Sequence, residues 1–345
     1  MKSLKILAVL VGFVIVTYIG IEPYAHHVFN PKVAPEDYTF ADLYPTLGRD
    51  EVEAERNRVK SLIANANLAV GAETFKNMCA ACHNMETTGI VTPAIDLINA
   101  NGLLPPDLSN ATSIYDEVFL VELIKDPANA VLIAGHTARQ NALLPQDAQK
   151  LIDAHPNMTL EEAEQTANET TQKAIASFDE KVRSTYFKMP FLGLTDDDAA
   201  NIVGFIKSQA KPIEEIDAKS VAVNACARCH SFIYDKVALQ AQEGELKSYL
   251  GGVLPPDLSV MIRSKGESYL QTFINDPQKH LLGTSMPRVG LTQQAQAKAV
   301  EYIDQIGDPK KDERNRLGVI FVLYFILLSA LAYMWKHNEF EEIGK

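Results

Sequence analysis

The chain has 345 residues, of which 47% are hydrophobic and 22% are charged. These proportions exclude an intrinsically disordered protein, and the length is sufficient for two domains of ordinary size. The formal net charge of −12 argues against a nucleic-acid partner, because an acidic surface repels phosphate backbones. Four cysteines are too few for a disulfide-rich scaffold.

The first predicted element is an apolar helix at the N-terminus. Lys2 and Lys5 precede an uncharged run over residues 6–21, which as a helix would reach about 24 Å, slightly less than a bilayer core. The lysines and the length of the run fit a signal peptide, but Glu-Pro-Tyr at residues 22–24 interrupts a small-residue cleavage site. We expect residues 1–21 to direct export, either as a cleaved signal or as a retained anchor.

A C-x-x-C-H motif occurs twice, as Cys79-Ala-Ala-Cys82-His83 and as Cys226-Ala-Arg-Cys229-His230. This pattern is typical of c-type haem attachment, in which both thiols form thioethers with the porphyrin and the histidine binds the iron. A redox-active dithiol does not require the histidine, and a zinc ribbon places its cysteine pairs much closer than 147 residues. Because the two motifs use all four cysteines, they predict two covalently bound haem c groups.

The sequence that follows each motif is also repeated. LPPDLS occurs at residues 104–109 and 254–259, and Met-Pro followed by Gly-Leu-Thr begins at Met189 and at Met286. The offset between the copies is 150 for the first pair and 97 for the second. One structural unit is therefore present twice, and its first copy carries about fifty extra residues before the methionine.

The repeat sets the predicted domain boundaries. After a lead segment at residues 22–66, we place one helical haem domain at residues 67–210 and a second at residues 211–308. The insertion falls within about residues 131–185, where the spacing predicts a helix that opens with the capping box Thr159–Glu162. We expect this insertion to form a helical cap over the first haem.

The repeated methionines, Met189 and Met286, are the predicted sixth ligands of the two irons. A thioether opposite an imidazole raises the reduction potential and leaves no open position for a substrate, as an electron carrier requires. Each Met-Pro pair precedes a threonine, Thr195 or Thr292, that is suited to cap a closing helix. Other methionines, which core packing also explains, are Met85, Met158 and Met261. Histidines that would give bis-histidine ligation instead are His136, His155 and His280.

The proline-rich loops are predicted to orient the iron-binding histidines. A metal-bound histidine usually donates its other ring N–H to an acceptor, and a proline carbonyl offers one, although a rigid turn alone also explains these prolines. The candidate pairs are Pro105 or Pro106 with His83, and Pro255 or Pro256 with His230. Arg263 is a candidate partner for a haem propionate, with an ordinary exposed arginine as the alternative.

The last predicted element is a transmembrane helix. Residues 317–335 carry no charge, and as a helix they would extend about 28 Å, enough to cross a bilayer. We therefore assign residues 309–335 to a linker and this helix, and residues 336–345 to a cytoplasmic tail. The orientation follows from the haem groups, since haem c is attached outside the cytoplasm.

In this chain a haem motif, LPPDLS, Met-Pro and a C-terminal membrane helix follow one another. With these features in this order, the sequence resembles the cytochrome c1 family, which comprises the haem c subunits of the quinol:cytochrome c oxidoreductase (cytochrome bc) complex. The resemblance is clearest over about residues 215–340, with CARCHS, VLPPDLSVMIRSK and the segment from RNRLGV to KHNEF. The doubled haem unit departs from the usual form and resembles bacterial versions with two fused haem domains. The resemblance implies one haem site formed by Cys226, Cys229, His230 and Met286, and the internal repeat extends it to Cys79, Cys82, His83 and Met189.

Together these features predict a mostly α-helical protein with two tandem cytochrome c-type domains on the periplasmic side of a bacterial inner membrane. The resemblance implies that cytochrome b and a Rieske iron–sulfur subunit are its partners and that a soluble cytochrome c accepts its electrons. The chain would then be an electron carrier without catalytic residues of its own. A di-haem subunit of a cbb-type oxidase, a free-standing anchored electron shuttle and a di-haem peroxidase are the alternatives. The acidic body suits a basic electron acceptor, or serves solubility alone.

Overall fold

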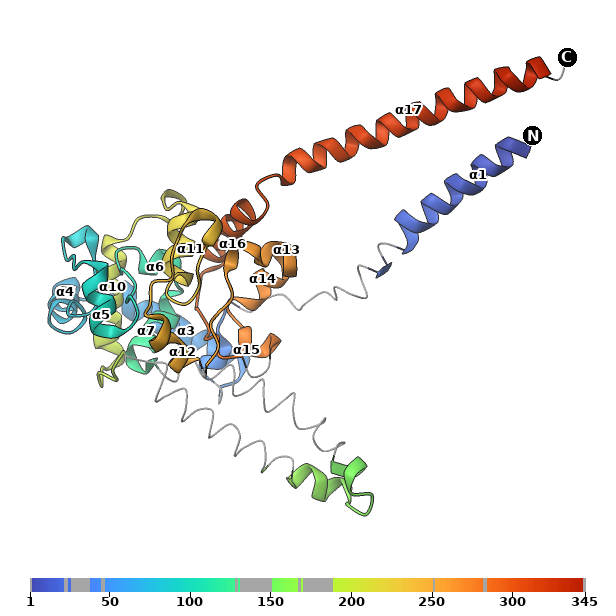
Figure 1. Ribbon diagram of the computed structural model, residues 1–345. Helices are drawn as coiled ribbons and strands as arrows, with labels where there is room; N and C mark the ends of the chain where they lie inside the picture. The colour runs from blue at the N-terminus through green and yellow to red at the C-terminus, as the bar shows by residue number, and fades with distance from the viewer. Residues whose placement is uncertain are drawn as a thin grey trace.

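The computed structural model is mostly helical, as predicted, and it describes residues 2–21, 24–25, 38–44, 47–127, 130, 151–166, 169, 189–250, 252–281 and 284–343. Within these ranges the chain forms helices and a few isolated β-bridges but no strand. The helices of both repeats gather into one body, and α17 extends away from it (Figure 1).

The two repeats follow the same order of elements. The N-terminal helix and the helices of the first repeat are α1 (Lys2–Ile15), α3 (Arg49–Ala64), α4 (Leu68–Thr74), α5 (Ala94–Asn101), α6 (Ala111–Ile114), α7 (Glu117–Lys125) and α10 (Asp196–Gln209). The helices of the second repeat and the C-terminus are α11 (Ala218–Cys226), α12 (Glu243–Tyr249), α13 (Met261–Lys265), α14 (Glu267–Phe273), α15 (Pro277–His280), α16 (Gln293–Gly307) and α17 (Lys311–Ile343). Short π- and 3₁₀-turns connect them, including η3 (Phe75–Cys79), which continues α4.

Each repeat is closed by its last helix, which packs on the helix that carries the haem motif. In the first repeat α10 packs on α4, and in the second α16 packs on α11. Both closing helices begin at the predicted threonines: the Thr195 hydroxyl accepts from the Asp198 amide at 3.2 Å, and the Thr292 hydroxyl from the Ala295 amide at 3.2 Å. The predicted caps are therefore confirmed, and they fix where each closing helix meets its partner.

The contact between α4 and α10 requires a glycine. A Cβ atom added at Gly71 would lie 2.1 Å from the backbone oxygen of Asn201 in α10, so the two helix backbones would have to move apart. We expect Gly71→Ala to lower the free energy of unfolding by about 1–3 kcal/mol, the usual cost of overpacking. Gly244→Ala in α12 is the matched control, because a Cβ there meets nothing within 4 Å. Thermal unfolding followed by circular dichroism compares the two, and equal unfolding temperatures would contradict this account.

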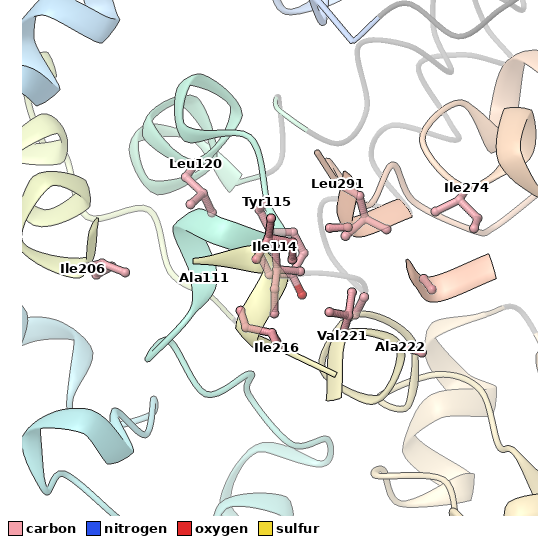
Figure 2. Close-up of a cluster of buried hydrophobic side chains, with 14 of the residues drawn as sticks. Ala111, Ile114, Tyr115, Leu120, Ile206, Ile216, Val221, Ala222, Ile274 and Leu291 are labelled. Atoms are coloured by element: carbon pink, nitrogen blue, oxygen red, sulfur yellow. The ribbon is translucent and has the colours of Figure 1, made fainter. Parts of the chain in front are cut away.

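The two repeats share one hydrophobic core. Figure 2 shows Ile114 and Tyr115 of the first repeat beside Val221 and Leu291 of the second. An antiparallel bridge joins Tyr115 to Leu291, and the Thr292 amide donates to the Ile114 oxygen at 3.0 Å. The division into two tandem domains stays a prediction, because in this structure the core runs across the proposed boundary.

Part of the predicted lead segment belongs to this core. Val59 and Ile63 of α3 are buried among the side chains of both repeats, and α3 packs on α7 and α10. The Arg56 guanidinium lies 3.0 Å from the Asp116 carboxylate, and both side chains are largely buried. The amphipathic spacing of α3 thus anchors the chain to the body well before the first haem motif.

The insertion in the first repeat is described only over residues 151–166 and at residue 169. The predicted capping box is present, with the Thr159 amide donating to the Glu162 carboxylate at 2.9 Å. This segment lies apart from the helical body (Figure 1), and Ala163, Met158 and their neighbours form a small cluster of their own. Most of the insertion lies outside the described residues, and the helical cap over the first haem stays a prediction.

The C-terminal helix meets the criteria for a membrane span. Within the described part of the chain, Lys311–Phe340 is the one helix long and apolar enough to cross a bilayer. Its base is tied to the body by charged side chains: Arg314 pairs with Asp308 at 2.6 Å and Lys311 with Asp304 at 2.8 Å. At the other end of the chain, α1 continues into a π-helical segment, Val16–Ile21, so the predicted N-terminal apolar segment is helical.

A charged cluster at the start of α10 gives the fold a pH dependence. The hydrogen bond from Lys125, together with that from Arg58, holds the pKa of the Asp196 carboxyl below its usual range, although burial opposes this. A group with a depressed folded-state pKa stabilises the fold above its unfolded pKa, and this contribution disappears as the pH falls through the folded value. We expect Asp196→Asn to cost less than about 1 kcal/mol at pH 7, since the cluster is partly exposed. In pH-dependent denaturation the difference from the wild type should shrink as the pH falls below the ordinary aspartate pKa toward the lowered folded-state value, and a difference independent of pH would contradict it.

Candidate haem sites

Both C-x-x-C-H motifs form the same tight helical turn. In each copy the backbone amides of the second cysteine and of the histidine donate hydrogen bonds to the backbone oxygen of the first cysteine. The Cys79 oxygen accepts from Cys82 at 3.1 Å and from His83 at 2.9 Å. The Cys226 oxygen accepts from Cys229 at 3.1 Å and from His230 at 2.9 Å. Residues three and four positions apart share one face of a helical turn. The turn therefore presents two thiols and one imidazole together, the donor set that haem c attachment requires.

Each motif histidine is held by a proline carbonyl. The His83 Nδ1 atom lies 2.9 Å from the Pro106 oxygen, and the His230 Nδ1 atom lies 2.7 Å from the Pro256 oxygen. A carbonyl can only accept, so Nδ1 carries the proton and Nε2 keeps its lone pair for a metal. The second proline of each pair provides this contact, and the expected hydrogen bond is present in both copies.

The sequence interpretation missed a second function of the LPPDLS loop. Its aspartate and serine accept hydrogen bonds from backbone amides just after the histidine. In the first copy these are Asp107 from Glu86 at 3.2 Å and Ser109 from Thr87 at 3.2 Å. In the second copy they are Asp257 from Ile233 at 2.9 Å and Ser259 from Tyr234 at 3.1 Å. The loop is thus clamped to the motif, and the repetition of Asp and Ser within LPPDLS was the signal for it.

The electrostatics of the motifs favour haem attachment over thiol redox chemistry. Burial raises the pKa of Cys79 to about 11 and that of Cys226 to about 12, whereas a redox-active C-x-x-C lowers the pKa of its attacking thiol. Burial also lowers the pKa of His83 and of His230, so both rings are neutral, as an iron ligand must be. No disulfide joins any of the four cysteines.

The same donor set does not form a zinc site. Among the described residues, no group of three or more histidine, cysteine or acidic side chains is arranged to hold a metal ion. Each motif instead offers a single imidazole with two partly buried thiols, a set that fits covalent attachment of a porphyrin and one histidine ligand to its iron. The residues present therefore fit haem c.

The loops that carry the two candidate methionine ligands are buried to different degrees. Met286 is followed two residues later by Arg288, a buried side chain that pairs with Asp276 at 2.8 Å. Met189 packs against the main core, but Phe191, in the position of Arg288, is 72% exposed. The ligand roles of both methionines stay predictions.

The alternative ligands occupy places that their packing explains. Met85 is fully buried in the main core. The buried Phe232 occupies the corresponding position in the second repeat. Each forms an isolated β-bridge with the residue five positions later in the chain. Met158 lies in the separate insertion cluster, and Met261 accepts a contact from Ser264 at 3.6 Å. The histidine alternatives are His155 in the insertion, His280 at the end of α15, and His136, which lies outside the described residues.

Arg263 lies at the base of α17 and forms an ion pair. Its guanidinium is 3.0 Å from the Asp308 carboxylate, and its side chain is 60% exposed. Asp308 also pairs with Arg314 at the start of the membrane helix. The assignment of Arg263 to a haem propionate stays a prediction, and this placement favours the alternative of a surface arginine.

Residues 68–154 match the protein family described as Cytochrome c. The match includes the first C-x-x-C-H motif and the first LPPDLS loop, and it supports a c-type cytochrome that carries covalently bound haem c and transfers electrons. None of the curated proteins and none of the solved structures compared with the chain matches it.

Proposed function

We propose that the chain is a membrane-anchored di-haem cytochrome c, the electron-transfer subunit of a quinol:cytochrome c oxidoreductase. The observation that carries the proposal is the duplicated geometry: two identical C-x-x-C-H turns, each with its histidine held by a proline carbonyl at 2.9 and 2.7 Å. A second haem is supported by this equivalence, because the second motif has the same turn, the same histidine-to-proline contact and the same aspartate and serine contacts as the first.

The assignment to a cytochrome bc complex rests on the order of the elements. A haem unit with LPPDLS and Met-Pro precedes a C-terminal apolar helix, as in the cytochrome c1 family that the sequence resembles. In this proposal cytochrome b and the Rieske iron–sulfur subunit are its partners, and a soluble cytochrome c accepts the electrons. The helical body faces the periplasm of a bacterial inner membrane, and α17 returns the chain to the cytoplasm.

The chain's own residues bind, orient and enclose the group. In each repeat the two cysteines would hold the porphyrin through thioethers, and the histidine and the methionine, His83 with Met189 or His230 with Met286, would bind the iron. Pro106 and Pro256 keep the Nδ1 proton in place, so that Nε2 remains a lone-pair donor. The bound haem supplies one-electron chemistry. An iron held by both an imidazole and a thioether would transfer electrons only, since no position would be left for a substrate.

Two measurements test the proposal. A pyridine haemochrome assay on the purified full-length chain should return two haems c per polypeptide, and one or none would contradict the di-haem assignment. Gentle purification from membranes should recover b-type haem and a Rieske cluster with the chain. Recovery with copper and oxygen uptake would replace the proposal with a cbb-type oxidase, and recovery of the chain alone would replace it with a free-standing shuttle.

A further inference from the structure

The helix that carries the second haem motif reaches the proline-rich loop of the first repeat. Asn224, two residues before Cys226 in α11, donates from Nδ2 to the backbone oxygen of Asp107 at 3.0 Å. Asp107 directly follows Pro106, whose oxygen lies 2.9 Å from the His83 Nδ1 atom. Two hydrogen bonds and the short backbone between them therefore connect α11 to the imidazole of the first site.

Tyr115 determines which end of the Asn224 amide faces the loop. Its hydroxyl donates to the Asn224 Oδ1 atom at 3.0 Å, and its side chain is buried in the shared core. Because this hydroxyl occupies the amide oxygen, the amide nitrogen is turned toward the Asp107 carbonyl, which can only accept. Burial raises the pKa of Tyr115, so the hydroxyl remains protonated and keeps its role as a donor.

The first repeat lacks this arrangement at the corresponding position. Asn77 occupies the place of Asn224 in the first repeat, two residues before Cys79, and there the side chain is exposed to solvent. Asn224 belongs instead to the segment that carries the second haem motif, and it reaches the loop that orients His83. The motif segment of the second repeat is thus part of the surroundings of the first histidine.

We propose that Asn224 is a positioning residue for the first haem site: the backbone of the second repeat holds the start of the proline-rich loop at Leu104, and Asn224 holds the part next to Pro106 that orients His83. The inference rests on the proposed function, because it concerns a haem bound at His83. A carbonyl acceptor increases the basicity of a ligating imidazole. Hydrogen bonding to the ligand is one of the factors that determine the reduction potential of a haem. A loop released from Asn224 holds the imidazole less firmly, so the potential of the first haem rises while that of the second stays unchanged.

The test is a redox titration of Asn224→Ala in the full-length, haem-loaded chain. We expect two haems to be retained, with one potential raised and the electron paramagnetic resonance signal of that haem shifted, because the signal reports the orientation of the imidazole plane. A variant with serine at Cys79 and Cys82 retains only the second haem and so assigns each signal. Asn77→Ala is the matched control and should leave both potentials and both signals as in the wild type.

Two further outcomes separate the possible failures. Tyr115→Phe keeps the Asn224 amide but frees it to rotate, and should raise the same potential by a smaller amount. This variant also serves as the test if Asn224→Ala does not load both haems. Unchanged potentials and signals, or a change at the second haem only, would overturn the role of Asn224. Fewer than two haems in the wild type would instead overturn the proposed function.

Discussion

Replacing Asp276 with alanine is expected to lower the free energy of unfolding by about 3–5 kcal/mol, the cost of leaving a buried charge without its partner. Asp276 and Arg288 form an ion pair at 2.8 Å in which the side chains are only 9% and 3% exposed. Arg288 also donates to the Asn275 backbone oxygen at 3.1 Å and lies 5.5 Å from the centre of the Phe40 ring. The guanidinium cannot reach water without opening the loop that carries Met286.

Thermal unfolding of the full-length chain in detergent measures this effect. Glu117→Gln is the control, because Glu117 pairs with Lys207 at the surface, where the lysine side chain is 56% exposed, and such pairs contribute less than about 1 kcal/mol. We expect a large drop in the unfolding temperature for the variant at residue 276 and almost none for the control. Comparable drops in the unfolding temperature of both variants would show that the buried ion pair contributes no more to stability than the surface pair.

Features that depend on neighbouring residues were predictable from the sequence. The caps at Thr195, Thr292 and Thr159 need only a side chain and an amide three residues away, and all three are present. The apolar helix at the C-terminus follows from composition alone. The histidine-to-proline hydrogen bonds were predictable as a type, but not which of two adjacent prolines provides the carbonyl, because that choice depends on the path of the loop.

Contacts between distant segments were not predictable in the same way. Nothing in the sequence places Asn224 against Asp107, since their meeting depends on how the two repeats pack. The incorporation of α3 into the shared core has the same cause: Val59 is buried by residues far along the chain. Both C-x-x-C-H segments form local helical turns, whereas part of the surroundings of the first one comes from the packing of one repeat on the other.

Substituting the candidate ligands is expected to change one haem at a time. Met189→Ala and Met286→Ala should each abolish one low-spin histidine–methionine signal and lower the potential of that haem, because a thioether opposite imidazole raises the potential. The second haem should keep its signal and its potential in each variant. Absorption spectra in the near infrared and redox titrations of the haem-loaded chain measure both effects.

The two loops also predict a difference in how firmly each methionine is held. Arg288 fixes the loop after Met286 to the buried Asp276, whereas Phe191, at the same place after Met189, is 72% exposed. An external ligand such as imidazole should therefore displace Met189 at lower concentration than Met286.

Met85→Leu is the control for the methionine substitutions, because Met85 is fully buried and a substitution that conserves its volume leaves the core intact. Loss of a low-spin signal in that variant, with both signals retained in Met189→Ala, would transfer the ligand role in the first repeat to Met85.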